Sequence, residues 1–224
     1  MVRLILRGIF AVLMLRTVVF ASSRSLSSQI LASVKCPSPN ALWRFNHEQL
    51  AHLVSKDLIV TPEFISMEEE KNLIDELDTH LLKHRYQNAH WDYYCGGSVV
   101  VISLLSDSVL RMSVPPVEEL VALPEDQPDL RSIALPGTDS WIDIRIPRRS
   151  VYVMRGGTRY LLAHAILSNA QVARLYEEHP ISLYDVQRAR RISVICRSKI
   201  RAKMIPYGEA PSEESAPFEP KPLE

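Results

Sequence analysis

Apolar residues follow a helical spacing early in the chain and a strand-like spacing after residue 98. Between Ser66 and about Arg85, leucines and isoleucines recur three and four residues apart, which is typical of an amphipathic helix. Ser66 and Glu69 form a capping box that predicts where this helix begins. We expect its apolar stripe to pack into the core rather than to bind a cofactor. The stripe consists of Leu73, Ile74, Leu77, Leu81 and Leu82.

From residue 98 onward, short runs of β-branched residues are separated by Pro, Gly and Asp, a pattern that predicts strands joined by turns. A shorter strand is expected earlier, at Leu58–Val60. A helical layer followed by antiparallel strands indicates an α+β fold with a β-sandwich or jelly-roll core. The acidic, proline-rich stretch 115–137 is expected to be a long loop inserted between strands. The later strands are expected at 98–105, 109–114, 141–146, 150–154 and 191–197.

The first 47 residues have the composition of a targeting segment. They contain six basic residues, no acidic residue, and seven serines between Ser22 and Ser38, which is typical of a mitochondrial transit peptide. A secretory signal is the alternative, because the run Gly8–Ala21 is mostly apolar, although Arg16 interrupts it. No run of 18 uncharged apolar residues occurs, so no membrane span is expected.

One folded domain is expected over residues 48–204. The chain has 224 residues, of which 46% are apolar and 23% charged, as in a domain with a single core of ordinary size. Residues 205–224 are rich in proline and glutamate and are expected to form a disordered tail. The cysteines at 36, 95 and 196 are too scattered for a disulfide framework, and no CxxC pair indicates zinc.

Charge is distributed unevenly although the formal net charge is zero. Residues 48–144 carry 18 acidic and 6 basic side chains, whereas residues 145–203 carry 13 basic and 3 acidic ones. The C-terminal half is therefore the better place for an anionic ligand.

The strand expected at 191–197 places two arginines on one face, because side chains alternate between the faces of a strand. If that face lines the interior, the guanidinium groups need an anion, and their planar fork fits a carboxylate with two parallel hydrogen bonds. The alternative is an edge strand whose arginines are hydrated. The face contains Arg191, Ser193, Ile195 and Arg197.

Two side chains upstream of this strand candidate are suited to a ligand site. His164 follows a strand-like run at 159–163, and a single histidine is more often structural than a ligand. Tyr152 precedes a Gly-Gly turn, and it either supplies its hydroxyl to the same cavity or packs as a core aromatic residue.

His90 and Asp92 have the His-x-Asp spacing that, with a distant histidine, forms the two-histidine, one-carboxylate triad of non-haem iron oxygenases. Three residues at such loose spacing are a weak signal. The alternative is that Trp91 anchors the helix to the sheet while its two neighbours form local hydrogen bonds.

Several blocks of the sequence together resemble the AlkB-like Fe(II)/2-oxoglutarate dioxygenases. The run Arg190–Ser198, with the sequence RRISVICRS, is the most specific of them. The resemblance implies a double-stranded β-helix, or jelly-roll, core with an N-terminal helical layer. The other blocks lie within 85–92, 95–109 and 152–164, and the match covers most of residues 56–200.

By this resemblance, Fe(II) is the cofactor, 2-oxoglutarate the cosubstrate, and His164 the distal iron ligand. The resemblance is best to a branch located in the mitochondrial matrix, which implies roles in fatty-acid metabolism and programmed necrosis and a protein or small molecule as substrate. No catalytic residue is assigned. The residues that contact 2-oxoglutarate by resemblance are Tyr152, Arg191, Ser193 and Arg197.

The sequence departs from the family at the iron site. In the branch that it resembles, the catalytic His-x-Asp lies on a strand downstream of the segment that contains His90 and Asp92, whereas here Tyr94 is followed at once by Cys95. One core segment is therefore missing, and a skipped exon or an incomplete gene model would remove such a block. Unless His90 and Asp92 substitute as ligands, we expect no stoichiometric iron binding and no conversion of 2-oxoglutarate to succinate.

Two other functions remain open from the sequence. A non-catalytic mitochondrial interaction protein on the same scaffold is favoured by the missing ligand pair. A nucleic-acid dealkylase is favoured by the stretch 188–203, which contains seven basic residues and no acidic one. That run includes the two arginines assigned to 2-oxoglutarate, and no aromatic-rich lid for base flipping is evident, so nucleic acid is the less favoured partner.

Overall fold

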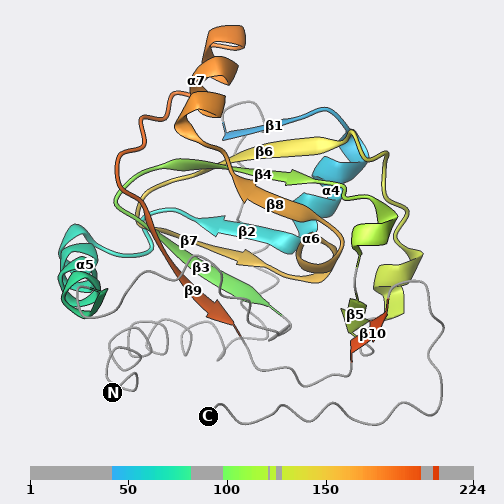
Figure 1. The fold of residues 1–224 in the computed structure, drawn as a ribbon, viewed down its shortest axis with the longest axis horizontal. Helices are drawn as coiled ribbons and strands as arrows, with labels where there is room; N and C mark the ends of the chain where they lie inside the picture. The colour runs from blue at the N-terminus through green and yellow to red at the C-terminus, as the bar shows by residue number, and fades with distance from the viewer. Residues whose placement is uncertain (1–41, 82–97, 121, 125–127, 198–203, 207–224) are drawn as a thin grey trace, which may run out of the picture.

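The computed structural model describes residues 42–81, 98–120, 122–124, 128–197 and 204–206. In these residues two four-stranded antiparallel sheets lie face to face, and helices pack around them (Figure 1). The expected combination of helices with an antiparallel strand core is therefore confirmed.

The first sheet has the strand order β1-β6-β4-β8, and the second has the order β2-β7-β3-β9. The strands of the first sheet are Trp43–Phe45 (β1), Trp141–Ile146 (β6), Ser108–Ser113 (β4) and Ala163–Ile166 (β8). The strands of the second sheet are Leu58–Thr61 (β2), Ser150–Met154 (β7), Val99–Leu104 (β3) and Ile192–Arg197 (β9). A separate small pair is formed by Ala122–Pro124 (β5) and Met204–Pro206 (β10).

Two short connections fix how the sheets stack. Residues 105–107 join β3 to β4, and residues 147–149 join β6 to β7, so each connection carries the chain from one sheet to the other at the same end of the sandwich. Because β3 lies over β4 and β7 over β6, the edge strands β9 and β8 lie on the same side. Each is paired with only one neighbour among the described strands, so this side of the sandwich is open there.

The interior between the sheets is apolar over most of its length. It is formed by inward side chains of both sheets and by the helix Glu48–Asp57 (α4), which contributes Leu50 and Val54. Burial of this surface is the main driving force for folding. The strand residues of this core include Val99, Val101, Leu110, Met112, Ile142, Ile144, Ile146, Tyr152 and Met154.

The helix Met67–Leu81 (α5) begins at the expected capping box. The backbone N–H of Glu69 donates to Ser66 Oγ at 3.1 Å, and the Ser66 N–H donates to Glu69 Oε2 at 2.7 Å. The helix packs on the outer face of the second sheet against Ile102 and Leu104, while the expected positions beyond Leu81 lie outside the described residues. Its packed side chains are Leu73, Ile74 and Leu77.

Three stretches of the chain contain elements that the sequence did not predict. The strand β1 lies within the segment expected to be a targeting peptide, and it pairs with β6. A strand of three residues with a central arginine has no periodic signal of its own, which is why it was missed. The expected loop 115–137 contains short 3₁₀ turns at Val117–Glu119 and Pro128–Ser132 as well as β5. The strand β10, at the C-terminal end of the expected domain, pairs with β5.

The run 159–163 before His164 is not a continuous strand, because its first two residues are helical and only its last belongs to a strand. Residues Gly156–Tyr160 form the helix α6, and β8 begins only at Ala163. The turn into α6 needs glycine, because Gly156 has φ +50° and a Cβ there would lie 2.6 Å from the Asp57 carboxylate. That carboxylate accepts the Gly157 N–H at 2.7 Å. The helices α4 and Asn169–Glu178 (α7) also had no sequence-based counterpart.

Candidate functional site

The strand β9 has the two-faced arrangement that its alternation predicts. Ile192 and Val194 pack in the cluster beneath α5, on the outer side of the sheet. Ile195 lies opposite Val101, which belongs to the interior core, so Ser193 and Ile195 face the space between the sheets. Arg197 ends the strand opposite Val99, and its side chain lies outside what the structure describes.

Arg191 and Tyr152 meet at the interior face of the second sheet. Tyr152, on β7, is 5% exposed and lies opposite Val101 of β3. Burial raises the pKa of Tyr152, while its hydrogen bond and charge interaction with the Arg191 guanidinium act in the opposite direction. Burial lowers the pKa of Arg191, but a guanidinium remains charged in proteins.

The Arg191 side chain has unmet hydrogen-bonding capacity. Its Nε and Nη2 are buried and have no hydrogen-bond partner in the part of the chain that the structure describes. The same is true of the hydroxyl of Ser193, two residues along the same strand. A buried cation and hydroxyl without partners are costly unless an acceptor is supplied, and a carboxylate has the charge and geometry to meet both.

Ser103 joins this group, although sequence reasoning did not identify it. It is fully buried on β3, lies directly opposite Ser193, and its hydroxyl also has no partner among the described residues. The signal in the sequence was a lone serine near the end of the apolar run Val99–Leu104. That signal becomes informative only once the register places it beside Ser193.

His164 lies on the interior face of the opposite sheet. It is paired with Met112 in the β4–β8 register, and Met112 is fully buried in the core between the sheets. The side chain of His164 is nevertheless exposed, because β8 is the edge strand on the open side. The register therefore directs His164 and Ser193 toward the same interior from facing sheets.

The resemblance implies two bound groups, 2-oxoglutarate and Fe(II), and the described residues fit the first better than the second. Arg191, Ser193 and Tyr152 supply the donors that a carboxylate requires. No group of three or more His, Cys, Asp or Glu side chains that could hold a metal occurs within the described ranges. His90 and Asp92 lie outside those ranges, so His164 is the one expected iron ligand that the structure describes, and the described donor set does not fit Fe(II).

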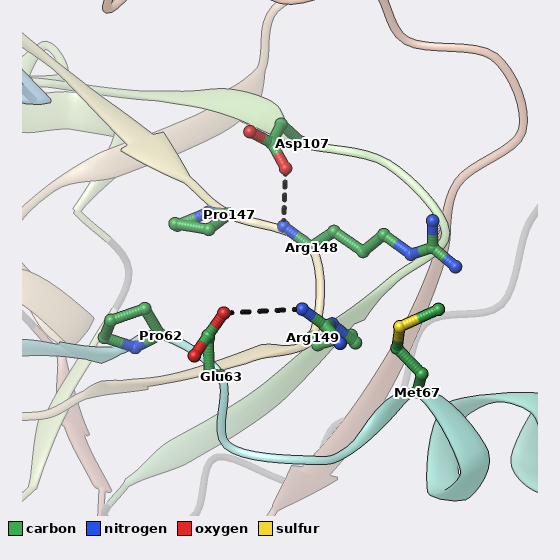
Figure 2. A pocket seen from close by; sticks show the side chains of 7 residues that line it. All are labelled: Pro62, Glu63, Met67, Asp107, Pro147, Arg148 and Arg149. Atoms are coloured by element: carbon green, nitrogen blue, oxygen red, sulfur yellow. Dashed lines mark hydrogen bonds and ion pairs between the residues drawn. The ribbon is translucent and has the colours of Figure 1, made fainter.

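The connections 105–107 and 147–149 close one end of the sandwich, which we call the closed end. A surface pocket near these connections has a different character (Figure 2). Its charges are already paired: Arg149 contacts Glu63 at 3.5 Å, and Asp107, which also accepts the Arg148 backbone N–H, binds Arg145 with 2.8 Å between Oδ2 and Nη2. The Arg148 guanidinium binds Glu70 of α5, with 2.6 Å between Nη2 and Oε2. Because these groups satisfy one another, the pocket offers no unmet charge to a ligand.

Two further expectations concern a membrane and nucleic acid. No helix within the described residues is long and apolar enough to cross a membrane. Among the bases of the stretch 188–203, Arg190 forms a salt bridge with Asp78 of α5, so it contributes less free positive charge than the sequence alone implies.

Comparison with known proteins identifies relatives of the chain. No family model matches it. A mouse (Mus musculus) protein named alpha-ketoglutarate-dependent dioxygenase alkB homolog 7, mitochondrial, is 27% identical over 238 residues, which cover 88% of this chain and 98% of the relative. The cattle (Bos taurus) protein of the same name is 26% identical over 213 residues, covering 69% of this chain and 81% of the relative. The resemblance to AlkB-like dioxygenases is thereby confirmed.

The length of the mouse alignment is itself informative. It spans 238 positions, more than the 224 residues of this chain. The alignment therefore contains positions at which the relative has a residue and this chain has none.

Proposed function

We propose that this chain, which is similar over most of its length to alkB homologue 7, is a mitochondrial AlkB-like protein with a jelly-roll core that binds 2-oxoglutarate between its sheets. We further propose that the chain as written does not hold catalytic iron, because the resemblance implies that the family's His-x-Asp segment is missing between Tyr94 and Cys95. The observation that carries the first part is Arg191, a buried cation whose Nε and Nη2 have no partner among the described residues.

The residues of the proposed site have distinct tasks. Arg191 neutralises a carboxylate of the ligand and orients it with two parallel hydrogen bonds. Ser193 donates a further hydrogen bond from the same strand face, and Tyr152 fixes the guanidinium from β7, on the far side of β3. Arg197 completes the set by resemblance. His164 faces the same interior and would be the distal iron ligand once a second ligand pair is present.

The open side of the sandwich supports a missing core segment. Ile195 faces the interior but is 52% exposed, which is unusual for an inward isoleucine. Ala163 and His164 on the facing edge strand are exposed as well. A segment lying along β8 and β9 would cover these side chains, pair the two open edges, and bring iron ligands next to His164. The mouse alignment independently contains positions that this chain lacks.

Two measurements on the full chain test this proposal. Calorimetry should detect 2-oxoglutarate binding, and an anaerobic Fe(II) titration followed by a succinate assay should detect neither stoichiometric iron nor turnover. Insertion of the mouse relative's corresponding segment between Tyr94 and Cys95 should restore both. Turnover by the unmodified chain that His90→Ala or Asp92→Ala abolishes would instead identify those residues as the triad.

The mitochondrial assignment rests on the basic, serine-rich N-terminus and on the names of the relatives. We propose a matrix location and, by analogy with this branch, a role in fatty-acid metabolism and programmed necrosis. Because β1 begins at Trp43 and is part of a sheet, import should remove residues before position 42 rather than up to 47. N-terminal sequencing of the protein recovered from mitochondria checks this, and a mature N-terminus at Met1 would contradict it.

A further inference from the structure

Three serines form one row across the second sheet at its closed end. The register places Ser103 of β3 opposite Ser193 of β9 on one side and opposite Ser150 of β7 on the other. Only Ser150 has a hydroxyl partner, since it donates to the Pro147 carbonyl at 2.6 Å. The hydroxyls of Ser103 and Ser193 have none among the described residues.

The hydroxyl of Ser103 is costly for a purely structural role. Ser103 is fully buried, and a buried hydroxyl without a hydrogen bond destabilises a fold by about 1–3 kcal/mol. A valine at this inward position of a strand would remove that cost. Ser108 and Thr158 also have buried hydroxyls without partners, so this property alone assigns nothing. Ser103 differs from them because Ser193 lies directly beside it, on the strand that follows Arg191.

The same chain shows how it binds a carboxylate. Arg111 uses Nε and Nη2 to hold the two oxygens of Asp143, each at 2.7 Å, and the Tyr184 hydroxyl adds a third hydrogen bond at 2.6 Å. In Arg191 the same two nitrogens, Nε and Nη2, are the ones without a partner among the described residues. The interior thus repeats the donors of the Arg111 site, with serine hydroxyls available in place of the tyrosine.

We propose that Ser103 is a further ligand of the bound dicarboxylate, donating its hydroxyl to the carboxylate that Arg191 and Ser193 hold. This rests on the proposed function, because it requires that 2-oxoglutarate occupies the interior. It extends the site from β9 to β3 and places the carboxylate at the closed end of the sandwich. It also assigns a role to a residue that neither the motif nor the alternation of β9 identified.

Two matched variants of the full chain test the proposal, with 2-oxoglutarate as the probe in calorimetry and urea unfolding as the second readout. Ser103→Ala should weaken binding about tenfold, the effect of losing one hydrogen bond to a charged group. Its urea midpoint without ligand should stay the same or rise, because an unmet buried hydroxyl is removed. Ser150→Ala should leave the affinity for 2-oxoglutarate unchanged, because the ligand contacts remain. It should lower the urea midpoint, because it leaves the Pro147 carbonyl unpaired.

The outcomes separate this inference from the function on which it rests. If the wild-type chain does not bind 2-oxoglutarate, the proposed function and the role of Ser103 are both wrong. If the wild type binds and Ser103→Ala binds equally well, only the role of Ser103 is wrong. A loss of stability in Ser103→Ala with unchanged affinity would make its hydroxyl structural.

Discussion

Two partly buried arginines of this fold differ in what balances their charge. Arg111, on the outer face of the first sheet, binds Asp143, whose side chain is fully buried. Arg191, on the inner face of the second sheet, has only the Tyr152 hydroxyl as a partner among the described residues. A cluster that the chain satisfies by itself serves stability, whereas one that it leaves unsatisfied indicates a ligand.

The Arg111 cluster connects segments that are far apart in the sequence. The Cζ atoms of Arg111 and Arg44 lie 4.7 Å and 5.3 Å, respectively, from the centroid of the Trp141 ring. The Tyr184 hydroxyl, beyond α7, donates to Asp143. The buried Asp143 carboxylate of β6 thus binds β4 and the chain after α7, while Arg44 of β1 joins the cluster through Trp141 and the Tyr184 hydroxyl.

The largest expected effect is the loss of Asp143. Asp143→Ala leaves the Arg111 guanidinium and the Tyr184 hydroxyl without their acceptor, and we expect a loss of about 3 kcal/mol in the free energy of unfolding. The value is at the low end for a buried pair because the Arg111 side chain is 30% exposed. Urea unfolding measures it. A double variant with Arg111→Met should recover part of the loss. Unchanged stability in the single variant would show that the Arg111 cluster does not serve stability.

Removal of Arg191 should have the opposite signature. Arg191→Met keeps the length of the side chain and removes a buried charge without an acid partner among the described residues, so the ligand-free protein should be as stable as the wild type or more so. The affinity for 2-oxoglutarate should fall by about 1.5–3 kcal/mol, the range for hydrogen bonds to charged groups.

The neighbouring arginine supplies the control for that prediction. Arg190→Met removes the same charge one residue away, from a side chain that binds Asp78 at the exposed surface of α5. Its affinity for 2-oxoglutarate should match that of the wild type. Equal losses of affinity in the two variants would mean that general positive charge, and not the Arg191 site, attracts the ligand.

A smaller effect is expected at Tyr184, and it depends on pH. Burial, and then the hydrogen bond to Asp143, raise the pKa of Tyr184 to about 12. Because the unfolded tyrosine has a pKa of about 10, the stabilisation is complete below pH 10 and is lost as the pH rises through 12. Tyr184→Phe should lower stability by about 1 kcal/mol at neutral pH. Its deficit relative to the wild type should shrink between pH 10 and 12, and a constant deficit in urea unfolding would contradict this.

The two clusters also mark the limit of what the sequence could predict. Alternation within β9 correctly placed Ser193 and Ile195 on one face, because period-2 geometry is local, but only the pairing with β3 shows that this face is the inner one. The strands β6 and β7 matched their expected bounds for the same reason. The pairing of Arg111 with Asp143 spans 32 residues and depends on register, which no local pattern contains. Ser103 was missed because its role depends on its cross-strand neighbour.

The smallest expected effect is that of iron on ligand binding. In an intact iron site the 2-oxo group binds the metal, whereas the donors described here are arranged for a carboxylate. Anaerobic addition of Fe(II) should therefore leave the calorimetric affinity for 2-oxoglutarate unchanged. Glutarate, which has both carboxylates and no oxo group, should bind within about a factor of three, or about 0.7 kcal/mol. If Fe(II) tightened the binding of 2-oxoglutarate about tenfold and did not affect glutarate, this chain would hold a metal beside His164, and the interior would be an intact iron site rather than a carboxylate site alone.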